Sequence, residues 1–148
     1  MLKFTTSIHK ELQVVSGTTP QRAQQRLRIL LAEDNRINQI VAEKILQSMG
    51  HECFSVGDGM QVLDIIGKTP FDAILMDCQM PELDGFETTK RIRTAEKQSK
   101  RHIPIIALTA SSQQADREHC LQCGMDSYLA KPFRKEELAK MLELISSL

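Results

Sequence analysis

The chain has 148 residues, 41% of them hydrophobic, and its 19 Lys and Arg residues balance 19 Asp and Glu residues. This length suits one globular domain with a substantial core, and zero formal net charge argues against a nucleic-acid or anionic-membrane surface. No apolar run approaches the roughly 18 residues of a membrane span. Residues 1–25 lack the central apolar block of a secretory signal, so we predict a cytoplasmic protein without direct membrane contact.

Residues 1–26 differ in composition from the rest of the chain. They contain a turn-forming stretch at 16–20, Ser-Gly-Thr-Thr-Pro, and a polar run at 21–25. This composition predicts a linker or N-terminal tail, although its scattered apolar residues could dock on the domain. The predicted division is therefore 1–26 as linker or tail and 27–148 as one folded domain.

From Leu27 a pattern of apolar run, turn and amphipathic stretch begins. Residues 28–32 predict a buried strand, and apolar residues then recur at helical spacing until Gly50. Residues 52–56 predict a second, more polar strand near a sheet edge. A short helix follows the turn at 57–59.

The next two units repeat this pattern. Residues 73–76 predict a third strand, buried on both faces, and a helix runs from Phe86 to about Thr94. The charged residues 95–101 are expected to form a solvated loop. Residues 103–108 predict a fourth strand, with Pro104 tolerable near its start.

A helix, a strand and a last helix complete the predicted domain. Ser111 and Ser112 are candidate N-caps for a helix that runs through Cys123 and ends at Gly124. Residues 128–130 predict a fifth strand. A final amphipathic helix is marked by Leu138, Met141, Leu142 and Ile145.

Strict alternation of strands and helices implies an α/β doubly wound parallel sheet with helices on both faces. The carboxyl ends of parallel strands share one edge, where such folds place their sites. The side chains expected at that edge are Glu33, Asp34, Asp77, Thr109 and Lys131.

This set of side chains indicates phosphoryl chemistry. Three nearby carboxylates repel one another unless one is protonated or a cation neutralises them. Hard oxygen ligands without clustered His favour Mg²⁺. A phosphate group commonly completes the coordination shell of this ion. Asp77 ends the central strand and is the best-placed nucleophile, while Lys131 and Thr109 suit the charge of an incoming phosphoryl group.

Cys120 and Cys123 have the Cys-x-x-Cys spacing, which alone is a weak metal or redox signal. On a helix the two would share a face, where free cysteines usually pack as small hydrophobes. We therefore expect core packing, with a thiol redox switch as the alternative.

Four motifs in order resemble the receiver domain of bacterial-type response regulators, over residues 27–148. They are Glu33-Asp34, Met76-Asp77 followed by Met80-Pro81 and Gly85, Leu108-Thr109-Ala110, and Lys131-Pro132. The resemblance implies a flavodoxin-like (βα)5 fold with strand order 2-1-3-4-5.

The resemblance also implies a reaction. Asp77 would accept a phosphoryl group from a phosphohistidine, carried by a histidine kinase dimerisation/phosphotransfer domain or by a histidine phosphotransfer protein. Asp34, Asp77 and the Gln79 main-chain carbonyl would bind Mg²⁺, with Glu33 acting largely through water. The domain would catalyse its own phosphorylation and dephosphorylation rather than turn over a separate substrate.

Further roles follow from the same likeness. Thr109 and Tyr128 would act as the switch, although Tyr128 could also be a plain half-buried strand aromatic. Gln79 and Ser111 would flank the phosphoryl site, and the Lys131–Pro132 bond would be cis. The readout face would comprise residues 113–124, 127–130 and 133–146, in a monomer or a phosphorylation-dependent dimer.

The residues most similar to receivers of hybrid sensor histidine kinases are Ala32-Glu33-Asp34-Asn35 with Asn38-Gln39, Leu75-Met76-Asp77-Cys78-Gln79-Met80-Pro81, Ala107-Leu108-Thr109-Ala110 and Gly124-Met125-Asp126. Together with the expectation that no output domain follows the last helix, this similarity predicts a receiver that is excised from, or terminates, a hybrid kinase. A stand-alone single-domain regulator is the second interpretation within the class. An aspartyl-phosphate phosphohydrolase fits less well, because Gln79 stands where a second carboxylate is expected. A docking module without phosphorylation is a further alternative.

Overall fold

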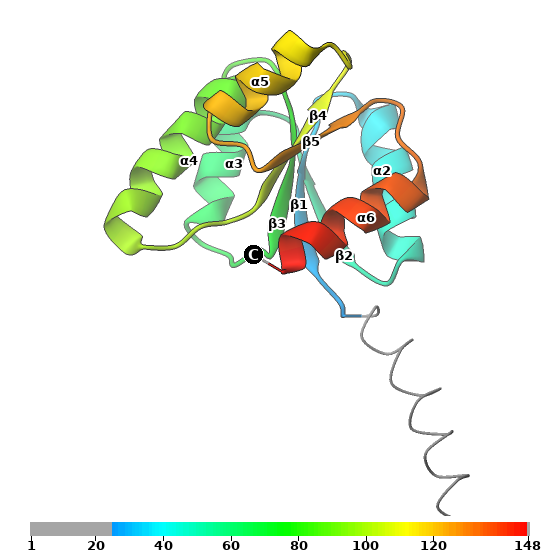
Figure 1. Cartoon of the computed structure of the whole chain (residues 1–148). Coiled ribbons are helices and arrows are strands. Elements are labelled where there is room, and N and C mark those ends of the chain that lie inside the picture. The colour runs from blue at the N-terminus through cyan, green and yellow to red at the C-terminus, as the bar shows by residue number, and fades with distance from the viewer. Residues whose placement is uncertain (1–24, 148) are drawn as a thin grey trace, which may run out of the picture.

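The computed structural model describes residues 25–147, in which a five-stranded parallel sheet lies between two layers of helices (Figure 1). The strand order is β2-β1-β3-β4-β5, and every neighbouring pair is parallel, as predicted. The strands are β1 (Arg28–Ala32), β2 (Glu52–Val56), β3 (Ala73–Asp77), β4 (Ile105–Thr109) and β5 (Ser127–Ala130).

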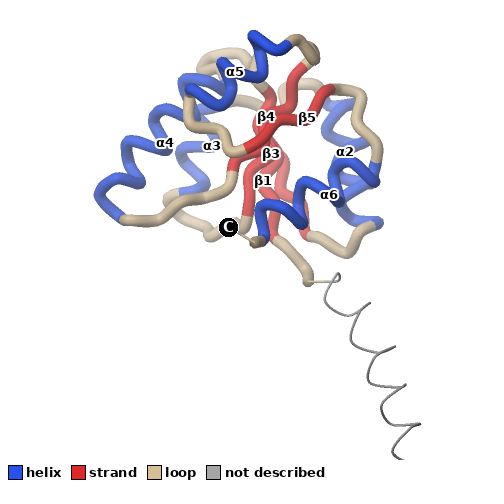
Figure 2. Tube along the Cα trace, viewed as in Figure 1, coloured by secondary structure: helices blue, strands red, loops and turns tan. Residues whose placement is uncertain are grey.

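Two helices cover one face of the sheet and three cover the other (Figure 2). On the first face lie α2 (Arg36–Ser48) and α6 (Lys135–Ser146). On the second lie α3 (Gly59–Ile66), α4 (Gly85–Ser99) and α5 (Gln114–Gln122).

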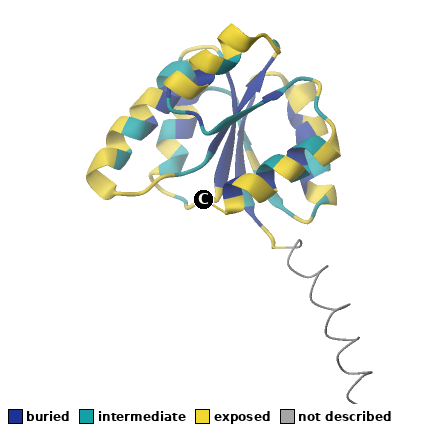
Figure 3. Cartoon of the chain, viewed as in Figure 1, coloured by how far each residue is buried: buried dark blue, intermediate teal, exposed yellow. Residues whose placement is uncertain are grey.

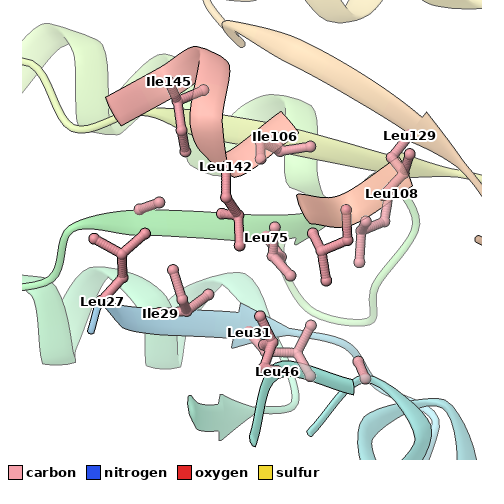
Figure 4. Close-up of a cluster of buried hydrophobic side chains, with 13 residues drawn as sticks. Leu27, Ile29, Leu31, Leu46, Leu75, Ile106, Leu108, Leu129, Leu142 and Ile145 are labelled. Atoms are coloured by element: carbon pink, nitrogen blue, oxygen red, sulfur yellow. The ribbon is translucent and has the colours of Figure 1, made fainter. Parts of the chain in front are cut away.

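The sheet separates two hydrophobic cores, because successive residues of a strand point to opposite faces. Leu75 of β3 packs with Leu31, Leu46 and Leu142 under α2 and α6 (Figure 4). Its neighbours Ile74 and Met76 belong to the core under the other three helices. The strands β1, β3 and β4 are accordingly buried along nearly their whole length (Figure 3), whereas the edge strand β2 is only partly buried, as predicted.

Side-chain N-caps define the first turn of the three helices that follow β1, β2 and β3. Asn35 accepts hydrogen bonds from the N–H groups of Ile37 and Asn38, and Asp58 and Asp84 cap α3 and α4 in the same way. These caps fix where the chain leaves the carboxyl edge of the sheet.

The prediction of a solvated loop at 95–101 is wrong for most of that stretch, because α4 continues to Ser99. Residues 95–98, Ala-Glu-Lys-Gln, are good helix formers. Two hydrogen bonds to the Glu96 side chain add to this propensity. One comes from Arg93 on the same helix and the other from the Ile103 N–H, beyond the helix. Lys100, in the left-handed region at φ 59°, ends the helix.

Two smaller boundaries also differ from prediction. The fourth strand begins at Ile105 rather than at 103, directly after Pro104. The N-cap of α5 is Gln113, not Ser111 or Ser112, and its side chain makes no capping hydrogen bond. The predicted linker lies outside the described residues except for Gln25 and Arg26.

Candidate functional site

The carboxyl ends of the strands open into a cavity of about 660 Å³. The sequence-predicted residues meet there: Glu33, Asp34, Asp77, Thr109 and Lys131 all line it. Gln79 and Ser111 line the same cavity, whereas Tyr128 does not. The topology thus brings together side chains from after β1, β3, β4 and β5.

Three carboxylates form the acidic centre of the site. Glu33, Asp34 and Asp77 each offer an oxygen within 4.8 Å of the others. Asp34 is exposed, whereas Glu33 and Asp77 are only 2% and 6% exposed. Two of the three negative charges are therefore held largely away from water, which is costly without a counter-charge.

Lys131 supplies that counter-charge from the end of β5. Its Nζ lies 2.9 Å from Glu33 Oε2 and 3.2 Å from Asp77 Oδ2. The ammonium group therefore donates to both buried carboxylates, with the shorter bond to Glu33.

The protonation equilibria follow from burial and from this lysine. Burial raises the pKa of Asp77 to about 6, with Glu33 adding to the rise and Lys131 opposing it. Burial also opposes ionisation of Glu33, but hydrogen bonds from Lys131 and the Asn35 N–H outweigh it and leave the Glu33 pKa lowered. The two carboxylates lower the free energy of the ammonium form, so the pKa of Lys131 is raised despite burial.

Two residues to which the sequence analysis assigned no role in the site position Glu33. The Asn35 N–H donates to Glu33 Oε1 at 3.1 Å. Gln39 on α2 is buried, and its Nε2 donates to the main-chain oxygen of Glu33 at 2.6 Å and to that of Val56 at 3.4 Å. The available signal in the sequence was that Gln39 shares a helix face with the apolar residues Ala42 and Leu46, but this spacing does not reveal which carbonyl the glutamine reaches.

Thr109 and Asp77 both have local hydrogen bonds. Thr109 Oγ1 donates to the Ser111 main-chain oxygen and accepts from the Ser111 N–H, both at 3.1 Å. Asp77 Oδ1 accepts from the Gln79 N–H at 3.3 Å. The Thr109 hydroxyl can therefore turn toward the cavity only by giving up its bond to Ser111.

The loop after Asp77 is held tightly against the start of α4. The Cys78 N–H donates to the Leu108 oxygen at 3.1 Å, and the Gly85 N–H donates to the Cys78 oxygen at 3.0 Å. A Cβ on Gly85 would overlap the Asp77 main-chain oxygen, so this close approach requires glycine.

The remaining predicted positions lie beside the cavity. The Lys131–Pro132 peptide bond is cis. Tyr128 is half-buried on β5, and the Arg117 guanidinium of α5 lies 4.9 Å from the centre of its ring. This distance is typical of a cation–π contact.

The donor set fits a hard divalent cation. It offers three carboxylates, two of them buried, whose oxygens lie close enough together to share one ion. Mg²⁺ prefers such oxygen ligands and keeps several waters, which the open cavity accommodates.

Together, fold and site define a flavodoxin-like α/β domain with a buried carboxylate in an acidic cluster whose geometry fits a divalent cation. A family model described as the response regulator receiver domain matches residues 29–143. The chain belongs to this family.

Known relatives place the domain among hybrid kinase receivers. Histidine kinase 1 of Arabidopsis thaliana is 38% identical over 158 aligned positions, which cover 84% of this chain and 13% of the kinase. The hybrid signal transduction protein dokA of Dictyostelium discoideum is 42% identical over 125 positions, covering 84% of this chain and 7% of that protein. The chain thus spans a small part of these relatives.

Solved structures of receiver domains are also similar to this chain. The receiver domain of a Pseudomonas aeruginosa sensor histidine kinase, which holds a magnesium ion in its active-site cleft, is 48% identical with a TM-score of 0.73. That match covers 82% of this chain and 99% of the other. The receiver of a Saccharomyces cerevisiae response regulator, crystallised with a histidine phosphotransfer protein, is 35% identical with a TM-score of 0.72, over 78% and 86% of the chains.

Proposed function

We propose that the domain is a phosphoacceptor receiver in which Asp77 takes a phosphoryl group from a phosphohistidine. One observation carries this proposal: a carboxylate at the end of the central strand is 6% exposed, yet it lies 3.2 Å from the Lys131 ammonium and faces an open cavity. The donor would be a histidine kinase dimerisation/phosphotransfer domain or a histidine phosphotransfer protein.

The reaction is an in-line displacement at phosphorus. An Asp77 carboxylate oxygen forms the new P–O bond while the P–N bond to the imidazole breaks, and the imidazole leaves with the bond electrons. Lys131 remains beside the carboxylate and neutralises charge on the phosphoryl oxygens. Thr109 exchanges its bond to the Ser111 oxygen for one to the phosphoryl group.

Asp34, Asp77 and the Gln79 main-chain carbonyl would hold Mg²⁺, with Glu33 acting largely through water. When bound, the ion neutralises negative charge on the carboxylates and the phosphate. Gln79 and Ser111 line the cavity that contains Asp77, where they would govern the access of the water that later hydrolyses the acyl phosphate.

The signal would leave the site through Thr109 and Tyr128. Loss of the Thr109–Ser111 bond would free the segment that leads into α5, and Tyr128 of β5 contacts Arg117 of α5. We therefore assign the readout to the surface formed by α5, β5 and α6, in a monomer or a phosphorylation-dependent dimer.

The parent protein would be a cytoplasmic or membrane-anchored hybrid sensor histidine kinase, with the receiver on the cytoplasmic side. The identities to hybrid kinases support this origin over a stand-alone regulator. Within residues 25–147 no helix is long and apolar enough to cross a membrane.

Intact-mass measurement after addition of Mg²⁺ and acetyl phosphate tests the function. We expect a Mg²⁺-dependent gain of one phosphoryl group in the wild type and none in Asp77→Asn. Asp58→Asn is the matched control, because asparagine caps a helix as well as aspartate does. Phosphate release without an adduct would instead indicate a phosphohydrolase, and neither signal, also with a phosphohistidine donor, would indicate a docking module.

A further inference from the structure

Two buried thiols lie in contact beside the phosphoacceptor. Cys78 directly follows Asp77, and its Sγ is 3.8 Å from the Sγ of Cys120 on α5. The two residues are 42 positions apart in sequence and are 6% and 1% exposed. Both also line the cavity of about 660 Å³ that contains Asp77, so the side of the phosphorylation site is where a small oxidant would approach them.

We propose that oxidation by a hydroperoxide joins Cys78 and Cys120 in a reversible disulfide that blocks phosphoryl acceptance at Asp77. The consequence for phosphorylation rests on the proposed function. The disulfide itself rests only on the position of the two thiols.

The chemistry balances with hydrogen peroxide as oxidant. Cys78, the more exposed thiol, attacks the peroxide O–O bond and becomes a sulfenic acid, and one water leaves. Cys120 Sγ then attacks the Cys78 sulfur, the S–O bond breaks and a second water leaves. Two thiols are oxidised by two electrons, and a thiol reductant reverses the step by exchange.

Burial of the two thiols slows their oxidation. It raises the pKa of the Cys120 thiol, and of the Cys78 thiol as well, so little thiolate is present at neutral pH. The pair is therefore expected to respond to sustained oxidising conditions rather than to a brief pulse.

The bond would draw α5 toward Asp77. A disulfide needs its sulfurs about 2.0 Å apart, so the present 3.8 Å must close. The backbone of Cys78 is held at both its N–H and its C=O, by Leu108 and Gly85. The Cys120 oxygen accepts a hydrogen bond from the Met125 N–H at 3.2 Å, but the N-cap of α5 makes no side-chain hydrogen bond, so we expect the N-terminal part of α5 to move more readily than the Cys78 loop.

Movement of α5 toward the loop narrows the cavity. His119 of α5 and Phe86 of α4 line the same cavity, and their rings are 4.3 Å apart. The covalent tie also opposes displacement of the segment after Thr109, because that segment leads into α5. Both effects act against phosphorylation.

The other two cysteines provide controls. Cys123 is also buried, at the C-cap of α5, and its Sγ lies 3.9 Å from His119 Nε2. Cys53 lies on β2, with its Sγ 3.9 Å from the Ser55 hydroxyl. Cys123→Ala therefore removes a thiol of similar burial from the end of the same helix without touching the proposed pair.

The test uses the full chain, treated with hydrogen peroxide and then freed of oxidant. Alkylation under denaturing conditions and peptide mapping locate any disulfide, while intact mass with Mg²⁺ and acetyl phosphate follows phosphorylation. We expect a Cys78–Cys120 bond in the wild type and in Cys123→Ala, with phosphorylation slowed about tenfold or more and restored by a thiol reductant. Cys120→Ala should form no such bond and keep its rate after the same treatment.

Three outcomes would overturn the proposal: absence of the Cys78–Cys120 bond, pairing of Cys120 with Cys123 instead, or an unchanged phosphorylation rate in the cross-linked protein. The reduced wild type separates the two hypotheses. If it gains no phosphoryl group from either donor, the proposed function fails, whereas peptide mapping still decides whether the disulfide forms.

Discussion

Lys131 binds two buried carboxylates whose pKa values are shifted in opposite directions. The shorter hydrogen bond goes to Glu33, whose pKa is lowered, while burial dominates at Asp77 and raises its pKa to about 6. At neutral pH Asp77 is therefore ionised and nucleophilic, but at a cost in folding free energy. Reactivity and stability are opposed at this residue.

This opposition predicts that Asp77→Asn stabilises the fold at neutral pH. The folded-state pKa of about 6 lies above the ordinary 3.8, so the folded state binds more protons and loses stability as pH rises from about 4 to 6. Without Mg²⁺, the variant should gain about 1–3 kcal/mol in free energy of unfolding at pH 7. Urea unfolding at pH 7 and at pH 4 measures this gain, which should shrink at the lower pH; a less stable variant at pH 7 would contradict it.

The same pKa predicts how phosphorylation depends on pH. Protonation removes the nucleophilic lone pair, so the rate of labelling by acetyl phosphate should fall as pH drops below about 6 when Mg²⁺ is limiting. Saturating Mg²⁺ should move this fall to lower pH, because the cation favours the carboxylate. Intact-mass time courses across the pH range measure both effects, and a rate that stays constant down to pH 4 would exclude them.

Replacing Lys131 should leave the electrostatic repulsion between Glu33 and Asp77 uncompensated. Lys131→Met leaves two buried carboxylates without their ammonium, so we expect the free energy of unfolding at pH 7 to fall by about 1–3 kcal/mol. Added Mg²⁺ or mild acid should recover part of this loss. Lys140→Met, at an exposed position of α6, is the control and should change stability little.

At the level of elements, the start of α4 determines the shape of the loop that carries Asp77. Gly85→Ala would force a Cβ against the Asp77 main-chain oxygen and place it 3.0 Å from the Cys78 Cα. We expect a loss of about 1–3 kcal/mol in unfolding free energy and slower phosphorylation. Gly67→Ala is the control, since its Cβ would meet nothing closer than 3.9 Å, and equal losses in both variants would refute the argument.

The elements also show what the sequence could and could not reveal. Continuous apolar runs and glycine stops such as Gly50, which has φ 88° in the structure, predicted the strands and the edge where the site residues meet, whereas the strand order followed from the resemblance to receiver domains. The length of α4 was missed because Glu96 is fixed by Ile103, a contact visible only after folding. The position of Gln39 and the approach of Cys78 to Cys120 were missed for the same reason, since they join separate elements.

Across the whole domain, one arginine, Arg93, joins α4 to the segments that precede β4 and β5. Arg93 of α4 is 15% exposed and donates to the oxygens of Gly124 and Ile103, at 2.8 and 2.9 Å, and to the carboxylates of Glu96 and Asp126. Asp126 in turn accepts from the Ile105 N–H at the start of β4. These bonds tie α4 to the segments that enter β4 and β5.

Arg93→Met should therefore destabilise the domain by about 2–4 kcal/mol, because it leaves buried acceptors unpaired. Arg91→Met should change stability by no more than about 0.5 kcal/mol, since Arg91 makes a half-exposed pair with Glu87 on the same helix. Thermal and urea unfolding of both variants measure the contrast. Similar effects would mean that the Arg93 bonds contribute no more than a surface ion pair.

The distance in sequence between Lys131 and its partners has a consequence for how the protein is made. After β1 and β2, each new strand joins the same growing side of the sheet, so pairing can follow the order in which the ribosome releases the chain. Lys131 is synthesised 98 residues after Glu33 and 54 after Asp77. A nascent chain that has already paired β1 with β3 thus holds its acidic edge without the lysine, and cellular Mg²⁺ is available to neutralise that edge until synthesis reaches β5.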